Sequence, residues 1–486
     1  MTEKTKERNY VNMQVNPCKM CMPMGASQAL KGFSKTMNII HGSQGCSTYI
    51  RRHMAAHYNE PVDIASSSLS EEGTVYGGSK NLKLGIKNLV NMYKPDMVGV
   101  LTTCLAETIG DDINRIVKEV VETGEFEDVD IIPIPTPGYG GSQSEGYFAA
   151  IRGILKYYGE KMSRTNEFAT HVVPKFYGDH VNIIVSNATC EDIREIKRIL
   201  AAMNIEGLII PDISDVFDAP FEKDYKKLCE DGVTREEIAK AFEAKATIEL
   251  GNLVAPIYSP AEFLSEVYDI PAYRLPLPLG LNFTDQFVET LLSIFNMSMP
   301  KELELERGRL LDAMIDSHKH SATGRCAVFG DMDLVSGITS LLEENGAKVA
   351  VAATGSKTKR FREKVGHLLK GYSQGNLESA SIMQDSDFET IRDVIKERDV
   401  NMMVGPSDGK FIWEKDGIDL VRVGFPVHDH IGAQRKLRFG YKGASQLMDE
   451  IVNKLLDQKH SGYKEKMMDK YYEKYTVRME ERLWEM

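Results

Sequence analysis

The chain has 486 residues, which is too many for one ordinary hydrophobic core and predicts two or three domains. Apolar residues make up 42% and charged residues 27%, the profile of a globular protein in water. The net charge of −12, without a visible basic face, argues against a nucleic-acid-binding protein. No run approaches the roughly 20 apolar residues of a membrane span, and the polar N-terminus, MTEKTKERNY, lacks the apolar core of a secretory signal. We therefore expect a cytoplasmic protein that contacts neither nucleic acid nor membrane.

Apolar runs alternate with amphipathic helical stretches along the chain. The runs that predict strands are Met97–Thr103, Val129–Pro135, Val181–Asn187, Gly207–Asp212, Cys326–Asp331, Lys348–Gly355, Val400–Pro406 and Leu420–Pro426. Helices are predicted over Glu191–Asn204 and Asp333–Gly346, the second with Gly346 as its C-terminal stop. Continuous apolar strands that alternate with helices favour an α/β fold with buried, mostly parallel sheets flanked by helices.

The predicted elements fall into three groups. We expect a first domain over residues 1–165, a second over residues 166–300 and a third over residues 301–457. A charged helical segment, Pro300–His320, links the second domain to the third. Residues 458–486 are rich in Lys, Glu, Tyr and Met and predict an exposed C-terminal helix.

Three of the seven cysteines lie where a loop meets a predicted helix. Cys104 ends a strand, Cys46 closes the glycine loop HGSQGC, and Cys21 lies just ahead of a helix expected to begin near Ala26. Ligands of parallel sheets bind beyond the carboxyl ends of the strands, and a helix N-terminus favours a thiolate. An odd number of cysteines spread over a long chain also argues against a disulfide framework, so we expect free thiols in a reducing compartment.

The wide spacing of Cys21, Cys46 and Cys104 is unlike a compact zinc or ferredoxin motif. A single cysteine at such a corner is most often a small buried residue. The residues alone therefore leave two alternatives open, either convergence of the three thiols on one centre or three separate packing positions.

The other cysteines have simpler interpretations. Cys18 forms a CxxC pair with Cys21, a spacing typical of half a zinc site or of a redox pair. No second CxxC accompanies this pair and no strand precedes it, so we interpret Cys18 as a spare thiol. We expect Cys190 at the entry to a helix, and Cys229 and Cys326 as structural residues.

Two further motifs carry weaker signals. His53 and His57 are four residues apart on a predicted helix, a spacing that can bind a metal. No HExxH pattern accompanies them, so a solvated or interface position is favoured. The stretch FGDMDLVSG predicts a tight turn between a strand and a helix, capped by Asp331 or Asp333.

Four long motifs, taken together, resemble those of a known family. In chain order they are NPCKMCMPMGA, HGSQGC, HYNEPVDIASSSLSEEGTVYGG and YKPDMVGVLTTCLAETIGDD. They resemble the beta-type subunits of the nitrogenase component 1 family, and the likeness spans nearly the whole chain after residue 15. The resemblance implies three Rossmann-like domains around a shared central cleft. It also implies an alpha-type partner in an α2β2 heterotetramer and a transient encounter with a reductase iron protein that uses ATP.

The resemblance also implies a metal site. Cys21, Cys46 and Cys104 match the beta-type ligands of an iron–sulfur cluster that both chains share at their interface. The cluster would be a 4Fe–4S cluster or an eight-iron 8Fe–7S cluster. Gly42, Ser43 and Gly45 would line it, because backbone amides of such a loop hydrogen-bond to cluster sulfides. No residue of this chain is expected to be catalytic or to bind nucleotide.

Departures from the family pattern bear on the role of the complex. Catalytic beta chains usually carry a serine at the position of Gly138 and a His-Val-Thr run at Gln143, Ser144 and Glu145. This difference resembles the scaffold beta chain, and we therefore expect a scaffold for iron–molybdenum-type cofactor biosynthesis in nitrogen fixation. Retention of all three cysteines resembles catalytic chains, so the alternative is an electron-relay subunit of a nitrogenase or nitrogenase-like reductase. A third hypothesis is an α/β binding protein whose cysteines merely pack.

Overall fold

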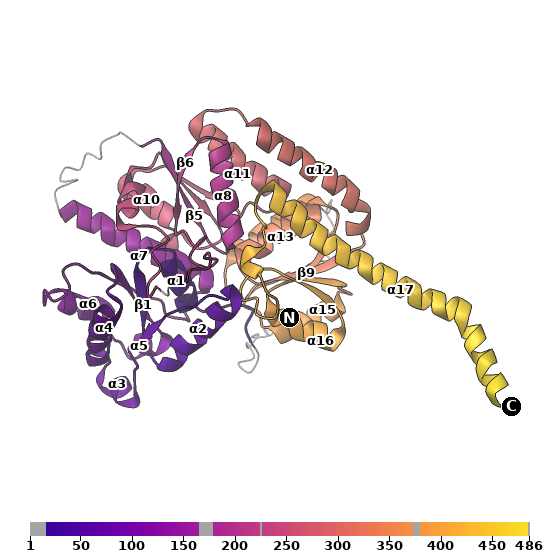
Figure 1. The fold of residues 1–486 in the computed structure, drawn as a ribbon, viewed down its shortest axis with the longest axis horizontal. Helices are drawn as coiled ribbons and strands as arrows, with labels where there is room; N and C mark the ends of the chain where they lie inside the picture. The colour runs from indigo at the N-terminus through magenta and orange to yellow at the C-terminus, as the bar shows by residue number, and fades with distance from the viewer. Residues whose placement is uncertain (1–15, 165–177, 224–225, 373–379, 485–486) are drawn as a thin grey trace, which may run out of the picture.

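A computed structural model describes residues 16–164, 178–223, 226–372 and 380–484 (Figure 1). Its described part contains three sheets that follow one another along the chain, and every strand ladder in them is parallel. The predicted α/β fold with three mostly parallel sheets is therefore confirmed. One sheet lies in each predicted domain, while the boundaries near residues 165, 300 and 457 stay a prediction.

The first sheet has the strand order β2-β1-β3-β4. Its elements are α1 (Met22–Lys31), β1 (Thr36–His41), α2 (Gln44–Tyr58), β2 (Ala65–Ser66), α3 (Glu71–Tyr76), α4 (Ser79–Tyr93), β3 (Met97–Thr102), α5 (Cys104–Thr108), α6 (Ile113–Val121), β4 (Asp130–Ile134) and α7 (Gln143–Arg164). Strands β1 and β3 pair over their full length and are buried at every residue. Their last residues, His41 and Thr102, lie opposite each other. The segments that carry Cys46 and Cys104 therefore leave the same edge of this sheet.

The second and third sheets repeat this parallel arrangement with the orders β6-β5-β7-β8 and β11-β10-β9-β12-β13. The elements of the second are β5 (His180–Val185), α8 (Cys190–Ala202), β6 (Glu206–Ile210), α9 (Arg235–Lys240), β7 (Ala246–Leu250), α10 (Pro260–Tyr268), β8 (Ala272–Leu275) and α11 (Gly280–Phe295). Those of the third are α12 (Lys301–Ser321), β9 (Arg325–Phe329), α13 (Met332–Glu344), β10 (Lys348–Ala353), α14 (Lys359–Tyr372), β11 (Ser381–Met383), α15 (Phe388–Glu397), β12 (Met402–Gly405), α16 (Lys410–Asp416) and β13 (Asp419–Arg422).

Local sequence signals set the helix ends. The Asp331 carboxylate accepts from the backbone N–H groups of Asp333 and Leu334, so Asp331 is the predicted cap of α13. Gly346 follows this helix with φ +81°, a conformation that favours glycine. Thr189 begins α8 with a capping box, in which Asp192 returns a bond to the Thr189 backbone.

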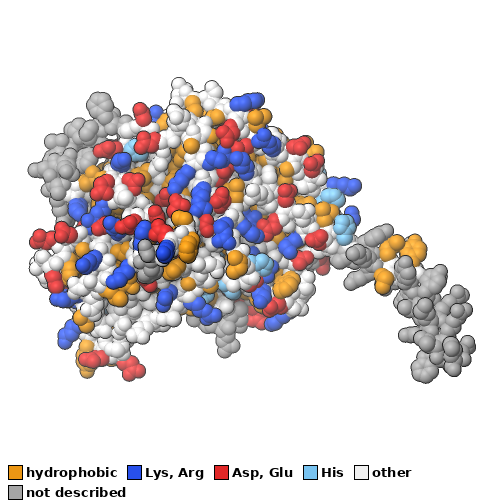
Figure 2. Space-filling view, viewed as in Figure 1, with side chains coloured by type: hydrophobic (Ala, Val, Ile, Leu, Met, Phe, Trp, Pro, Cys, Tyr) orange, Lys and Arg blue, Asp and Glu red, His pale blue; other side chains and the backbone are white. Residues whose placement is uncertain are grey.

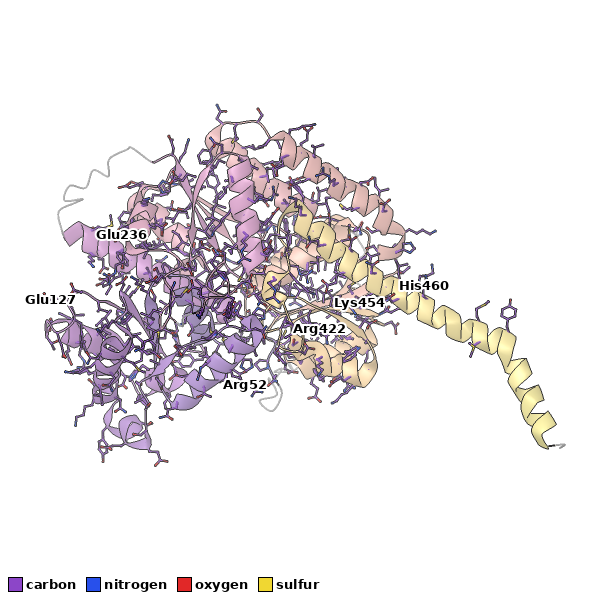
Figure 3. All side chains as sticks on the ribbon, in the orientation of Figure 1. Arg52, Glu127, Glu236, Arg422, Lys454 and His460 are labelled. Carbon is purple, nitrogen blue, oxygen red and sulfur yellow. The ribbon has the colours of Figure 1, made fainter. Side chains whose placement is uncertain are left out.

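Helix α17 (Gly440–Trp484) closes the chain. Leu447, Ile451 and Leu455 are spaced four residues apart, are buried, and hold its first half against the body, where α12 is its main neighbour. Its second half leaves the body near His460 (Figures 1 and 3). The predicted tail is thus a continuation of α17, and residue 457 lies inside this helix. No helix in the described ranges is long and apolar enough to cross a membrane.

The surface mixes charges of both signs. Figure 2 shows acidic and basic side chains interspersed over the face in view. The net charge of −12 is therefore not gathered into one acidic patch on this face.

Candidate metal centre

The three candidate thiols occupy the predicted corners, with changes in detail. Cys21 is the N-cap of α1, which begins at Met22, so the expected start near Ala26 was wrong by about one turn. The proline at the second position of α1 is compatible with a helix start, because the first N–H groups have no intrahelical partner. Cys21 also forms an isolated antiparallel bridge with Ser142, which ties it to the start of α7.

Cys46 lies inside the first turn of α2, because this helix begins at Gln44. Its side chain is exposed, and the Ser43 hydroxyl lies 3.9 Å from its sulfur. Gly42, at the start of the loop, contacts the next ligand segment. A Cβ on Gly42 would stand 2.3 Å from the Thr103 hydroxyl oxygen, so only glycine fits there.

Cys104 is the first residue of α5 and is also exposed. Thr103 caps this short helix by accepting from the Ala106 N–H. The helical stretch that follows Cys104 is divided into two helices, α5 and α6. Gly110 adopts φ +80° and ends the helical path, and α6 begins anew at Ile113 with Asp112 as its cap.

The structure brings these three thiols together. The pKa of Cys21 is raised, first by burial and then by its nearness to Cys46 and Cys104. Gly138 lies between two of them, since a Cβ there would stand 2.8 Å from the Cys104 sulfur and 3.5 Å from the Cys21 Cβ. Convergence is therefore the alternative that the geometry favours over separate packing. Their role as metal ligands stays a prediction.

The donor set suits an iron–sulfur cluster better than one metal ion. Thiolates are the usual ligands of such clusters. Within the described residues, no group of three His, Cys, Asp or Glu side chains is close enough to hold a single ion. Because Cys46 and Cys104 are exposed, a second polypeptide has access to the same space.

The remaining cysteines point elsewhere. Cys18 is buried in the core of the third domain, so it does not act beside Cys21 despite the CxxC spacing. Cys190 begins α8 and is buried, as expected for a small residue at a helix entry. Cys326 is buried within β9, and Cys229 is half-buried in a loop.

The histidine pair of α2 is not a metal site. The His53 ring nitrogen bonds to the Tyr49 carbonyl, whereas His57 is buried and its Nδ1 accepts from the Val427 N–H. The expectation of a solvated or interface position was therefore wrong for His57. Its hydrogen-bond partner Val427 lies 370 residues later in the chain, so no local pattern in the sequence could have predicted this contact.

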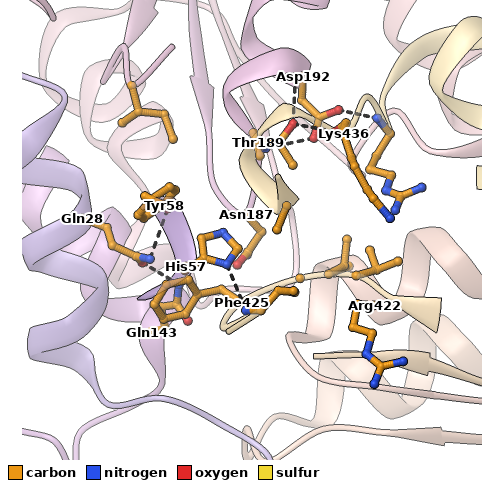
Figure 4. Close-up of a pocket in the computed structure, with 18 of the residues that line it drawn as sticks. Gln28, His57, Tyr58, Gln143, Asn187, Thr189, Asp192, Arg422, Phe425 and Lys436 are labelled. Carbon is orange, nitrogen blue, oxygen red and sulfur yellow. Dashed lines mark hydrogen bonds between the residues drawn. The ribbon is translucent and has the colours of Figure 1, made fainter. Parts of the chain in front are cut away.

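His57 lines a small pocket where the three domains meet (Figure 4). The pocket has space of about 50 Å³ for molecules the size of water and is mostly filled by side chains. Gln28 and Gln143 come from the first domain, Asn187 from the second and Phe425 from the third. The resemblance implied a shared central cleft between the three domains, and this small pocket lies between them.

Sequence reasoning also missed a buried network around His41. Its ring lies 2.9 Å from the Ser67 hydroxyl and 3.0 Å from Asp111 Oδ2. The three residues are far apart in the sequence, and the only local signal is that His41 opens the HGSQGC motif.

Comparisons with known proteins bear on the whole chain. The family model "Nitrogenase component 1 type Oxidoreductase" matches residues 21–456. The nitrogenase molybdenum-iron protein beta chain of Clostridium pasteurianum is 32% identical, over 92% of this chain and 94% of that protein. The protein of the same name from Methanococcus maripaludis is 35% identical, over 93% and 96%.

Solved structures agree. The structure described as "Nitrogenase Cp1 at pH 6.5" matches with a TM-score of 0.84 and 31% identity, covering 94% of this chain and 95% of that one. A second match, "Nitrogenase Cp1 at pH 5", has a TM-score of 0.61 at 17% identity and shows the fold alone. The chain therefore belongs to the nitrogenase component 1 family, as one of its beta-type members.

Proposed function

We propose that this chain holds an iron–sulfur cluster jointly with an alpha-type subunit, through Cys21, Cys46 and Cys104. The observation that carries the proposal is that Cys21 and Cys104 meet at Gly138 and that Cys46, like Cys104, acts on Cys21, while Cys46 and Cys104 are exposed at the surface. As a beta-type member of its family, the chain pairs with an alpha-type subunit, and its family implies metal–sulfur clusters. The finer proposal is an α2β2 assembly that meets a reductase iron protein with ATP only transiently.

The residues of this chain have distinct parts in the proposed site. The three thiolates would ligate iron, and the cluster would supply one-electron transfer. Ser43 and Gly45 would offer backbone amides to cluster sulfides. Gly42 would line the loop without donating to the cluster, because its N–H donates to the Ser67 hydroxyl. Gly45 is exposed and has only the Ser43 hydroxyl near its Cβ position, at 3.7 Å, so the loop has open space on its outer side.

The surface near Gly138 supports a partner. Tyr139 and Ile257 are 68% and 70% exposed, so two large apolar side chains are available to a partner there. The Tyr258 hydroxyl donates to the Gly140 carbonyl, so the two loops that carry these side chains adjoin. A second subunit seated there would bury both side chains next to Cys104.

Two roles for the complex remain, and we propose the electron relay of a catalytic-type component. It is supported by the retention of three thiols and by relatives that are named nitrogenase molybdenum-iron protein beta chains. The second candidate is the scaffold for cofactor assembly. It is supported by Gly138, because a glycine offers no side-chain oxygen to a cluster.

Iron content separates these roles. The chain is co-purified anaerobically with its alpha-type partner, and iron is counted per alpha–beta pair. About eight irons support the relay and about four support the scaffold. Cys46→Ala should lower the count, whereas Cys229→Ala, a half-buried cysteine outside the site, should not. An iron-free wild-type complex would overturn both roles.

A further inference from the structure

The loops that carry Cys46 and Cys104 are joined by one buried residue, His41. Its imidazole is fully buried and both ring nitrogens have partners. Burial outweighs the opposing effect of Asp111 and lowers the pKa of His41 from its ordinary 6.5, which favours the neutral ring. A neutral ring has one N–H, which donates from Nε2 to the Asp111 carboxylate and leaves Nδ1 to accept from the Ser67 hydroxyl.

This arrangement of donors reaches the loop of Cys46. The Ser67 hydroxyl donates its hydrogen to His41, so the Ser67 oxygen can accept from the Gly42 N–H. The Gly42 nitrogen lies 3.1 Å from this oxygen. Gly42 in turn accepts from the Leu69 N–H through its carbonyl. Both backbone groups of Gly42, its N–H and its carbonyl, are therefore hydrogen-bonded, which fixes the start of the HGSQGC loop four positions before Cys46.

The same residue holds both ends of α5, which begins with Cys104. The His41 carbonyl accepts from the Thr103 N–H and from the Thr103 hydroxyl, both at 3.1 Å. At the other end, Asp111 binds the His41 ring and also accepts from the Gly78 N–H at 2.9 Å. The His41 carbonyl therefore holds the residue before α5, and the His41 ring holds Asp111 shortly after it.

We infer that His41, with Ser67 and Asp111, positions Cys46 and Cys104 relative to each other for the shared cluster. This inference rests on the proposed function for the cluster itself. His41 touches neither sulfur in the structure, so it acts through Gly42 and Thr103 as a positioning residue. Gly42 and Thr103 are in direct contact, so closely that Gly42 could not carry a Cβ. A shift of either residue would therefore change the distance between Cys46 and Cys104.

The test uses the anaerobic alpha–beta complex and two variants of the network. Ser67→Ala removes the bridge between Gly42 and the ring, and His41→Gln removes the ring. Outer partners of metal ligands typically contribute about 10-fold to 100-fold in metal affinity. We expect each variant to lose iron at roughly a tenth of the chelator concentration that strips the wild type. Its cluster should also give a shifted electron paramagnetic resonance spectrum.

Matched controls separate positioning from stability. His57→Gln also removes a bond of a buried histidine, and Ser317→Ala also removes a buried hydroxyl that accepts a hydrogen bond, both outside the ligand loops. These controls should keep the wild-type spectrum and chelator resistance. Ser67→Thr keeps the hydroxyl and should retain the wild-type spectrum and chelator resistance. Wild-type spectra and iron retention in Ser67→Ala and His41→Gln would overturn the inference.

One arm of the test does not depend on iron. Hydrogen exchange of the full chain is followed in peptides that cover residues 42–49 and 103–112. Loss of a buried bond worth about 1.4 kcal/mol speeds exchange about 10-fold. Faster exchange in both peptides of Ser67→Ala supports the link between the loops, and unchanged exchange in residues 103–112 overturns it. An iron-free wild-type complex with coupled exchange would reject the proposed function alone.

Discussion

At the scale of single residues, the free space around the thiols limits which side chains can stand beside them. Gly138 is a position where one added carbon would press directly on a thiol, because its Cβ would stand 2.8 Å from the Cys104 sulfur. Real contacts of this kind are longer, so Cys104 or the loop would have to shift. The sequence showed that Gly138 departs from the family pattern. It did not show the contact, because the loop after β4 approaches α5 only in the folded chain.

Gly138→Ala should weaken the cluster without weakening the fold. The half-buried loop can move to admit a methyl group, but Cys104 then leaves its place beside Cys21. We expect chelator to remove iron from the complex about 10-fold more readily, with the unfolding temperature unchanged. Gly308→Ala is the control, because nothing lies within 4 Å of its Cβ position on α12. Equal iron retention in the two variants would reject this account.

At the scale of elements, continuous apolar runs predicted β9, β10, β12 and β13 to within a few residues. The sequence missed β7 because its second-to-last residue is Glu249, which breaks the apolar run. In the fold this carboxylate is buried and paired with Arg274 Nε at 2.7 Å. The partner lies on the neighbouring strand β8 but comes 25 residues later in the chain, so the local sequence shows only an unpaired charge, which is typical of a loop. Strand β1 was missed for the related reason that Asn38 interrupts its apolar run and His41 ends it.

Helix α8 offers a test of local stabilisation. Thr189→Ala removes the hydroxyl that accepts from the Asp192 N–H and donates to the Lys436 carbonyl. Loss of an N-cap typically costs about 1 kcal/mol. We expect a lower midpoint of urea unfolding followed by circular dichroism. The control is Thr290→Ala on α11, whose hydroxyl donates to the Gln286 carbonyl of the preceding turn and which should stay within about 0.5 kcal/mol of wild type.

At the scale of the molecule, the three domains meet around His57. This buried ring joins α2 to the loop after β13, through the Val427 N–H. Burial lowers the pKa of His57 from 6.5 to about 4. Between these values the unfolded chain binds a proton that the folded chain does not. Stability from this group is therefore complete above about pH 6.5 and is lost as the pH falls towards 4, by up to about 3 kcal/mol.

His57→Gln should remove this acid sensitivity. The variant starts less stable, because the Val427 N–H loses its acceptor, but its unfolding temperature should fall less between pH 7 and pH 5. Thermal unfolding at pH 7, 6 and 5 measures the difference, and His460→Gln, an exposed histidine on α17, should follow the wild type. A wild-type pH dependence in His57→Gln would show that other groups set the acid limit.

The N-terminal segment has a mechanical consequence. Residues 16–19 lie on the third domain, where the Cys18 N–H donates to the Ser386 carbonyl and the Cys18 carbonyl accepts from the Gly355 N–H, both at 2.9 Å. Three residues later the same segment supplies a candidate ligand to the first domain. The third domain therefore cannot swing away without pulling on Cys21. Any hinge motion of this protein would be transmitted to the environment of its thiols through a tether only a few residues long.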